Sequence, residues 1–376
     1  MDLRRLTGPF LQGILPLSSS LSSDHDSPST RTLRAYGWDE FFENAFTEHA
    51  AAGLVPARIA RVDRGQVTTI TADGPVRAAS AALAVCTGDW AAVKPGDQPE
   101  LAALLPRRTA LVRSSASRTS EGQPLAANID TVAVTVSVAA PLNPGRVERM
   151  VALAWESGAL PVLVLTKADQ AGAVGVANGV ADEVAALAPG VDVLVTSSVT
   201  GLGLDRLGDV LTGTVVLLGP SGTGKSTLGN ALLGTDRLAT GRVRAQDGKG
   251  RHTTVHRELL PLPGGGVLID TPGLRAVGLH DSESGLQQVF AEIEELAQQC
   301  RFADCGHDNE PGCAVLAAIA DGSLPERRLA SYRKLQRENE WATARSDARL
   351  RAERESQRKA ISQSLRATYS FRGRQR

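Results

Sequence analysis

Residues 213–227 read Gly-Thr-Val-Val-Leu-Leu-Gly-Pro-Ser-Gly-Thr-Gly-Lys-Ser-Thr, and this stretch decides the fold. A short apolar run leads into a loop that matches G-x-x-x-x-G-K-[ST], and a helical pattern continues to Leu233. Glycines in such a loop let backbone N–H groups surround phosphate oxygens at the positive end of the following helix. The stretch therefore predicts a polyphosphate site in an α/β domain, in preference to a plain glycine-rich turn.

The side chains that end this loop have separate expected tasks. We expect Lys225 to reach the β- and γ-phosphates, Ser226 to ligate Mg²⁺ through its hydroxyl, and Thr227 to donate toward the α-phosphate. The residues expected to surround the phosphates are Gly219, Pro220, Ser221, Gly222, Thr223, Gly224, Lys225, Ser226 and Thr227.

Composition is that of a globular protein with room for two or three domains. The chain has 376 residues, of which 42% are hydrophobic and 22% charged. No apolar run is long enough to span a bilayer, so we expect a cytoplasmic protein without a membrane partner. The net charge is zero, but residues 326–376 hold fifteen Lys or Arg against six Asp or Glu. The basic end predicts a polyanion-binding arm on an acidic body.

The region before the phosphate-binding domain changes character twice. Residues 1–30 end in a Ser/Asp/Thr-rich stretch and are expected to be mobile. Aromatic and leucine side chains recur at helical spacing from Arg31 to His49, which predicts one amphipathic helix packed on the next domain. From residue 55 to 118, short alternating runs broken by glycines predict a small antiparallel barrel of the OB-fold type.

Four arginines near the end of this barrel have two possible roles. They could track the phosphate backbone of an RNA, since OB-folds often hold oligonucleotides, or they could form a solvated charged face. Sequence alone leaves both alternatives open for Arg107, Arg108, Arg113 and Arg118.

From residue 129 onward, apolar strands alternate with helical patterns, which predicts a parallel sheet flanked by helices. The expected helices cover Arg146–Glu156 and Val176–Leu187. The expected strands are Thr131–Val138, Pro161–Leu165, Val191–Val195, Thr214–Leu218 and Gly266–Ile269.

Two motifs downstream of the phosphate loop carry groups suited to nucleotide hydrolysis. Asp270 ends an apolar strand, where its carboxylate can face Mg²⁺ through water, and Gly273 can offer its N–H to the γ-phosphate. The run Gly-Arg-His-Thr-Thr at 250–254 supplies hydroxyls for a switch loop. Either Thr253 or Thr254 is expected to ligate Mg²⁺.

A guanine-reading motif lies upstream of the phosphate loop. The Asp169 carboxylate can accept from guanine N1–H and N2–H₂, whereas adenine offers no such pair of donors. The residues expected to contact the base are Thr166, Lys167, Ala168, Asp169, Ser197 and Ser198. Ordinary guanine-nucleotide switches carry these motifs after the phosphate motifs. The reversed order predicts a circular permutation, which keeps strand positions in space.

A cluster of sulfur and nitrogen ligands follows this domain. Three cysteines and a histidine within fourteen residues suit a closed, tetrahedral and therefore structural zinc site. The expected ligands are Cys300, Cys305, His307 and Cys313. Helical segments are expected from Leu316 to about Arg351, with Tyr332, Leu335 and Trp341 packed on the zinc module.

In its motif order the chain resembles the circularly permuted small ribosomal subunit biogenesis GTPase family, RsgA. The resemblance rests on an OB-like barrel, T-K-x-D, G-P-S-G-x-G-K-S-T, G-R-H-T-T, D-T-P-G and C-x₄-C-x-H-x₅-C, and on segments 88–90, 105–107 and 126–130. It implies a GTPase that binds the small (30S) ribosomal subunit and its 16S rRNA late in maturation. It also implies GTP hydrolysis that the subunit stimulates.

The sequence departs from related GTPases at two places. Thr166 stands where GTPases usually have Asn, so one bond to guanine or to the phosphate loop is expected to be weaker. Leu274 stands where Ras-like proteins have the water-orienting Gln, and leucine cannot orient water. His252 is the nearest candidate catalytic substitute, with contacts to RNA or to the switch backbone as the alternatives.

The sequence therefore predicts a multidomain protein: an antiparallel OB-fold β-barrel, a circularly permuted P-loop α/β GTPase domain and a C-terminal zinc-binding helical domain. The expected division is a mobile segment 1–30, a helix and barrel 31–118, a GTPase domain 119–290, a zinc domain 291–350 and a basic tail 351–376. We expect a monomer that binds GTP and GDP. The rival hypotheses are a P-loop ATPase, a small-molecule kinase, and a nucleotide-gated binding module with negligible hydrolysis.

Overall fold

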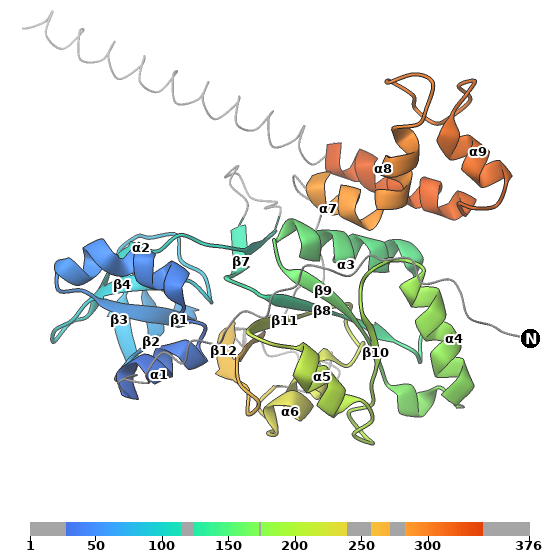
Figure 1. Cartoon of the computed structure of the whole chain (residues 1–376). Helices are drawn as coiled ribbons and strands as arrows, with labels where there is room; N and C mark the ends of the chain where they lie inside the picture. The colour runs from blue at the N-terminus through green and yellow to red at the C-terminus, as the bar shows by residue number, and fades with distance from the viewer. Residues whose placement is uncertain (1–27, 114–122, 173, 239–256, 271–282, 341–376) are drawn as a thin grey trace, which may run out of the picture.

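The structure is a computed structural model that describes residues 28–113, 123–172, 174–238, 257–270 and 283–340. A barrel, an α/β domain and a helical C-terminal module follow one another along the molecule (Figure 1). Within the described residues, no helix has the length and apolar character that crossing a bilayer requires.

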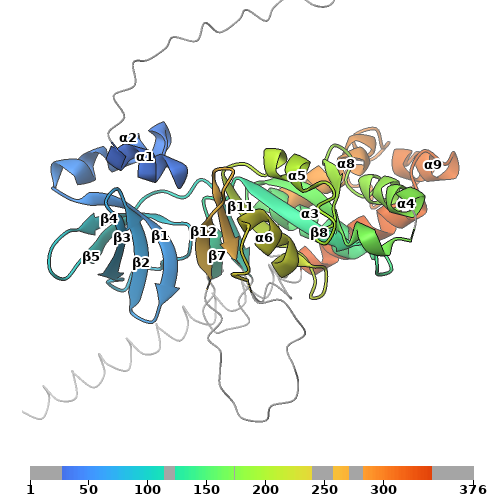
Figure 2. The same cartoon turned by 90° about the horizontal axis from the view of Figure 1, so that it is seen from below.

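Helices α1 (Pro28–Ala35) and α2 (Glu40–Ala51) replace the single helix expected between residues 31 and 49. Gly37, at φ +89°, turns the chain between the two helices. Asp39 then starts α2, because its carboxylate accepts a hydrogen bond from Phe42 N at 3.3 Å. The turn lets both helices lie on the same side of the barrel (Figure 2).

Aromatic packing fastens these helices to the barrel. Trp38 lies edge-on to Trp90 with ring centroids 4.8 Å apart, and Phe42 lies 5.6 Å from the same indole. Leu33, Phe42 and Phe46 are buried in this cluster. Phe41, which the sequence places with them, is 44% exposed and faces outward.

The expected OB-fold barrel is confirmed. Its strands are β1 (Val55–Asp63), β2 (Gln66–Thr71), β3 (Gly74–Ala79), β4 (Trp90–Lys94) and β5 (Glu100–Leu104). They pair in the order β1-β2-β3-β5-β4, and β4 closes the barrel by pairing with β1. Small and branched side chains fill the interior, where Ile59, Val67 and Leu101 are fully or almost fully buried.

Arg107 and Arg108 make structural contacts that the sequence did not predict. The Arg107 guanidinium makes two bonds to the buried Asp89 carboxylate, at 2.6 and 2.8 Å. Arg108 pairs with Asp39 at 2.6 Å, and its guanidinium lies 4.7 Å from the centre of the Phe42 ring. Arg107 therefore links two segments of the barrel, and Arg108 links the barrel to the start of α2. The Arg113 side chain and Arg118 lie outside the part described.

The expected parallel sheet is present, with strand ends within two residues of those expected. Its strands are β8 (Thr131–Ser137), β9 (Leu160–Thr166), β10 (Val193–Val195), β11 (Thr214–Leu218) and β13 (Val267–Asp270). They lie in the order β10-β9-β8-β11-β13, so β11 has a parallel neighbour on each side. The carboxyl ends of these strands therefore meet at one edge of the sheet.

The sequence did not predict three further strands. β12 (Glu258–Pro261) runs antiparallel to β13 and also pairs with β1 at Arg61↔Glu258, which makes the barrel and the α/β sheet continuous. β6 (Ala110–Arg113) and β7 (Gln123–Ala127) form a separate hairpin at the junction. The four residues of β12 are too few to predict a strand, and the strand forms because it pairs with β1 and β13.

A buried arginine fixes the same junction. Arg58 of β1 donates to Tyr36 O, to Asn128 O and to Thr214 Oγ1 of β11, each at 3.1 Å. Complete burial lowers the pKa of Arg58 to about 10, and the nearby Asp130 and Asp89 carboxylates oppose that fall. The barrel is thereby attached to the first residue of the strand that leads into the phosphate loop.

Helices cover both faces of the parallel sheet. α3 (Pro144–Glu156) and α4 (Val174–Ala185) pack on one face, where Val147, Val151 and Val184 join one buried cluster. α5 (Leu204–Val210) and α6 (Lys225–Leu233) pack on the other, with Leu207 and Leu228 in a second cluster. This is the three-layer arrangement of an α/β domain.

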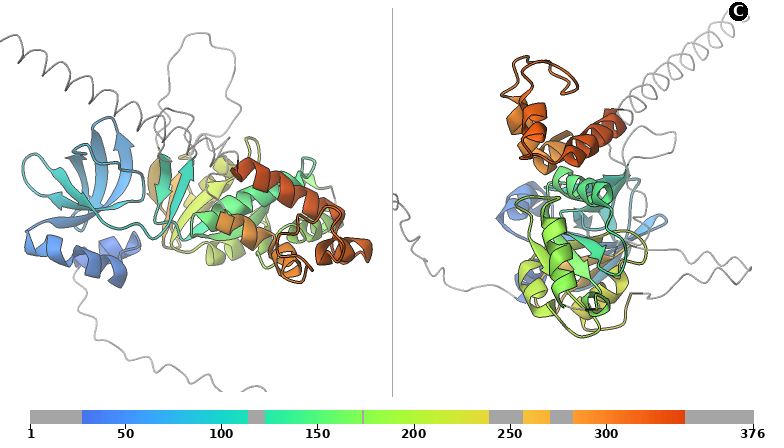
Figure 3. Two further views of the ribbon diagram at one scale, coloured as in Figure 1. Left: turned by 90° about the horizontal axis from the view of Figure 1, so that it is seen from above. Right: turned by 90° about the vertical axis from the view of Figure 1, so that its right-hand side faces the viewer.

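The C-terminal module lies on the outer side of α3 (Figures 1 and 3). It contains α7 (Glu283–Val289), α8 (Ala291–Ala297), α9 (Ala314–Ala320) and a helix over residues 326–340. Tyr332 and Leu335 are buried in the core cluster that also contains Cys313, while Trp341 lies outside the described residues. One hydrophobic core therefore runs from the sheet through α3 into the module.

Candidate functional site

The phosphate loop joins strand β11, which lies between β8 and β13, to α6. Gly222 and Gly224 have φ values of +86° and +90°, a conformation that other residues rarely adopt. Lys225 begins α6, and its ammonium donates to Gly219 O at 2.8 Å and to Pro220 O at 2.7 Å. Ser226 and Thr227 follow in the first helical turn. The cation and the N–H groups at the start of the helix therefore share one loop, which suits an anion.

Thr135 of β8 supports this loop, and sequence reasoning missed it. Its hydroxyl lies 2.8 Å from Thr223 Oγ1, and a Cβ on Gly219 would come within 2.1 Å of it. Gly219 is therefore required by close approach to the neighbouring strand. A threonine inside the apolar run 131–137 was the available signal, but such a residue also occurs in ordinary buried strands.

Asp270 ends β13, the strand beside β11. Burial and the facing Glu258 raise the pKa of its carboxyl, while the positive charge of Lys225 lowers it. The carboxylate and the lysine are therefore close enough to interact. The Asp270 carboxylate and the Ser226 hydroxyl are the hard oxygen groups that Mg²⁺ prefers, so the donor set fits that ion.

The loops after β9 and β10 contain the residues that are expected to read the base, and these residues contact one another. Ser197 Oγ donates to Asp169 Oδ1 at 2.6 Å. The same hydroxyl oxygen accepts from Val199 N at 3.3 Å and Thr200 N at 3.2 Å. Ser197 therefore holds one oxygen of the Asp169 carboxylate, and that carboxylate keeps further lone pairs for a ligand.

Direct contacts join the base-reading loop to the phosphate loop. Thr166 Oγ1 donates to Thr223 O at 2.5 Å, and Lys167 Nζ donates to Gly222 O at 2.6 Å. Segments more than fifty residues apart in the chain therefore lie together. The threonine that stands in place of Asn therefore does contact the phosphate loop, and the expected weakening of one bond stays a prediction.

A cavity of about 420 Å³ opens between the base-reading loop and α6. Ser198 and Thr227 lie on its two sides, and Thr235 and Asp236 contribute to its wall. Asn230 holds this wall in place through Leu238, donating to its carbonyl at 2.9 Å and accepting from its N–H at 2.7 Å. Sequence reasoning missed these wall residues because they belong to no motif. The cavity has room for part of a nucleoside.

Five residues with proposed roles lie outside the part of the chain that the structure describes. They are His252, Thr253, Thr254, Gly273 and Leu274. Their expected roles stay predictions.

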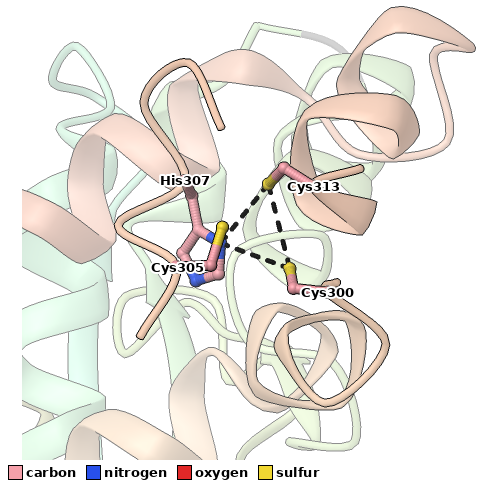
Figure 4. Close-up of side chains that lie close together, drawn as sticks. All are labelled: Cys300, Cys305, His307 and Cys313. Atoms are coloured by element: carbon pink, nitrogen blue, oxygen red, sulfur yellow. Dashed lines mark hydrogen bonds between the residues drawn. The ribbon is translucent and has the colours of Figure 1, made fainter. Parts of the chain in front are cut away.

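The cysteines and histidine of the C-terminal module converge (Figure 4). Cys300 Sγ lies 3.9 Å from Cys313 Sγ, and His307 Nδ1 lies 3.6 and 3.5 Å from these two sulfurs. Tetrahedral zinc with ordinary bond lengths requires about 3.8 Å between sulfurs and about 3.6 Å between sulfur and nitrogen. All the ligand atoms, including that of Cys305, lie within 4.8 Å of one another. The spacing fits a zinc ion bound by four protein ligands.

Comparison with known proteins agrees with these features. The RsgA GTPase family model matches residues 104–280. A protein of Streptomyces coelicolor, "Small ribosomal subunit biogenesis GTPase RsgA", is 56% identical over 89% of this chain and 93% of its own. A protein of the same name from Streptomyces avermitilis is 57% identical over 87% of this chain and 91% of its own. The chain belongs to the RsgA GTPase family.

Solved structures related to the RsgA family have the same fold. YjeQ from Thermotoga maritima aligns with a TM-score of 0.56 and 25% identity, over 75% of this chain and 97% of its own. YloQ, titled a circularly permuted GTPase, aligns with a TM-score of 0.56 and 21% identity, over 76% of this chain and 94% of its own. The predicted circular permutation of the α/β domain is confirmed.

Proposed function

We propose that this RsgA-family protein binds GTP between the Asp169 and Lys225 loops and hydrolyses it to GDP and phosphate during late maturation of the small (30S) ribosomal subunit. The contact of Thr166 with Thr223 supports this proposal most directly, because it joins the loop of Asp169, the residue proposed to read guanine, to the predicted phosphate loop. The names of the relatives supply the ribosomal partner. Work on ribosomal subunits would place the protein in the cytoplasm.

The proposed division of labour follows from the chemistry of each group. Asp169 accepts from guanine N1–H and N2–H₂, while Ser197 and Ser198 border the base. Lys225 moves from the loop carbonyls to the β- and γ-phosphates, and Gly273 N–H donates to the γ-phosphate. Ser226 and one of Thr253 and Thr254 would hold Mg²⁺ directly and Asp270 through water, and that ion would neutralise charge on the β- and γ-phosphates.

Water activation is assigned to His252, because Leu274 has no polar group to orient a water molecule. Such a site should turn over slowly until the ribosomal subunit orders it. The Cys300, Cys305, His307 and Cys313 site would hold zinc with no open position, so its role is structural. We further propose contact with 16S rRNA and a monomeric state.

Steady-state GTP turnover with purified 30S subunits, 50S subunits or neither tests the proposal. We expect slow turnover alone, at least tenfold stimulation by 30S subunits only, and little ATP hydrolysis in any mixture, since adenine lacks the paired donors that Asp169 requires. Equal rates in all three mixtures would contradict the ribosomal role. Faster turnover of ATP would support the ATPase or kinase hypothesis, and binding without hydrolysis would support a nucleotide-gated module.

A further inference from the structure

Arg328 is a buried cation in the C-terminal module, and its side chain donates hydrogen bonds to several other segments. It lies on the helix over residues 326–340 and is 2% exposed. Its Nη1 donates to Glu148 of α3 at 2.8 Å and to Leu187 O, beyond α4, at 3.0 Å. Nε donates to Glu292 at 2.7 Å and Nη2 to Val289 O at 2.8 Å. One side chain therefore links α3, the segment after α4, α7 and α8.

Glu148 is the partner of Arg328 on the GTPase side, and it is fully buried. One of its carboxylate oxygens accepts from Arg328 at 2.8 Å and, at 3.3 Å, from the more exposed Arg327, while the other has no hydrogen-bond partner within the described part of the chain. A buried ion pair seldom stabilises a fold more than apolar side chains of similar volume would. The pair does, however, permit only one arrangement of these helices, because displacement would leave a buried charge without its partner.

The turn of α3 that contains Glu148 also faces the nucleotide site. Arg146, Val147 and Met150 line a cavity of about 330 Å³ whose opposite wall includes residues 220–223 of the phosphate loop. Glu148 contacts the C-terminal module from the same helical turn. A shift of this turn therefore changes its distance from both the module and the loop.

The rest of α3 attaches to the same module, so the helix cannot move independently of it. Arg149 pairs with Glu338. Glu156 accepts from Ser284 Oγ at 2.9 Å and from Gly285 N at 3.0 Å. A Cβ on Gly285 would come within 2.2 Å of Ala152 O, so α7 lies in close contact with α3.

We infer that Arg328 is a positioning residue for GTP turnover. By holding Glu148 it fixes the α3 turn 146–150 against the phosphate loop. The C-terminal module and the nucleotide site would then respond to the ribosome as one unit. This inference rests on the proposed function. Errors of about 1 Å in the placement of reacting groups can lower a rate about 100-fold, so a small shift of α3 is sufficient to slow GTP turnover.

The test compares GTP turnover in variants that remove both fully or almost fully buried partners; the charges that lose a contact, on Glu292 and Arg327, are partly exposed to water. Arg328→Met combined with Glu148→Leu replaces both partners by apolar side chains and should fold. Arg328→Lys retains the positive charge. The matched control is Arg61→Met with Asp63→Leu, an ion pair of 3.0 Å on the barrel, away from α3. Zinc content, denaturant midpoint, GDP dissociation constant and 30S-stimulated kcat are measured for each protein.

We expect the Arg328→Met/Glu148→Leu variant to keep its zinc and bind GDP within about twofold of wild type, but to lose about tenfold in 30S-stimulated kcat. Arg328→Lys should recover part of that loss, and the barrel control should match wild type. Wild-type kcat in the folded double variant would overturn the inference, as would failure of that variant to fold, which would make the pair purely structural. Absence of stimulation in wild type would instead refute the proposed function.

Discussion

At the scale of residues, short polar contacts position the site. Asp169 was predictable because T-K-x-D follows an apolar strand, and its bond to Ser197 joins two loops whose pairing the sequence already suggested. Thr135 was not predictable, since its role depends on lying beside Gly219 across the sheet. Sequence motifs therefore supplied the candidate ligand-binding groups, while supporting residues such as Thr135 became visible only in space.

The cysteines give a prediction at this scale, because the chain has four and they occupy different environments. Cys86 is buried, and burial together with the Asp89 charge raises the pKa of its thiol, so it stays protonated and unreactive in the folded protein. With zinc bound, a thiol reagent at pH 8 should find no reactive cysteine. Chelation should expose three, and denaturation with chelation all four.

Counting thiols with such a reagent checks this directly. A reactive Cys86 in the folded, zinc-loaded protein would contradict the assigned burial. Unchanged reactivity of Cys300, Cys305 and Cys313 after chelation would show that they do not bind the metal.

At the scale of elements, local signals located most strands and helices but missed where a helix breaks. Gly37 and the Asp39 cap divide the region from 28 to 51 into α1 and α2, although aromatic spacing alone fits one continuous helix. Strand β12 escaped prediction because its pairing with β1 and β13 is a tertiary feature. The phosphate loop, by contrast, was predictable from its own residues.

Neighbouring phenylalanines on α2 provide a matched prediction. Phe42 is fully buried against Trp38 and Trp90, whereas Phe41 is 44% exposed. Phe42→Ala should lower the free energy of unfolding by about 3–5 kcal/mol, because it removes a buried ring from the interface between helix and barrel. Phe41→Ala should change it by less than about 1 kcal/mol.

Urea denaturation of the two variants, followed by tryptophan fluorescence, measures this difference. Equal destabilisation would contradict the packing of α2 on the barrel. The comparison controls for helix propensity, since both substitutions replace the same residue type on the same helix.

At the scale of the whole molecule, the order of motifs along the chain differs from the order of strands in space. The base-reading loops come first in sequence, yet β9 and β10 lie beside β8 and β11 in one sheet, so their carboxyl ends meet the phosphate loop. The sequence predicted this because each motif directly follows an apolar strand. It could not predict that one arginine on each side, Arg58 and Arg328, attaches the barrel and the C-terminal module.

The most direct test that the base-reading loops and the phosphate loop meet at one site is the base preference of the purified protein. It is measured by calorimetry with GDP, ADP and xanthosine diphosphate (XDP). Wild type should bind GDP about 100-fold more tightly than ADP, because adenine leaves the Asp169 carboxylate without donors. Asp169→Asn should reverse the order of GDP and XDP while Lys225 still holds the phosphates. Equal affinity of wild type for GDP and ADP, or an Asp169→Asn variant that still prefers GDP, would contradict a single guanine-nucleotide site built from these separated loops.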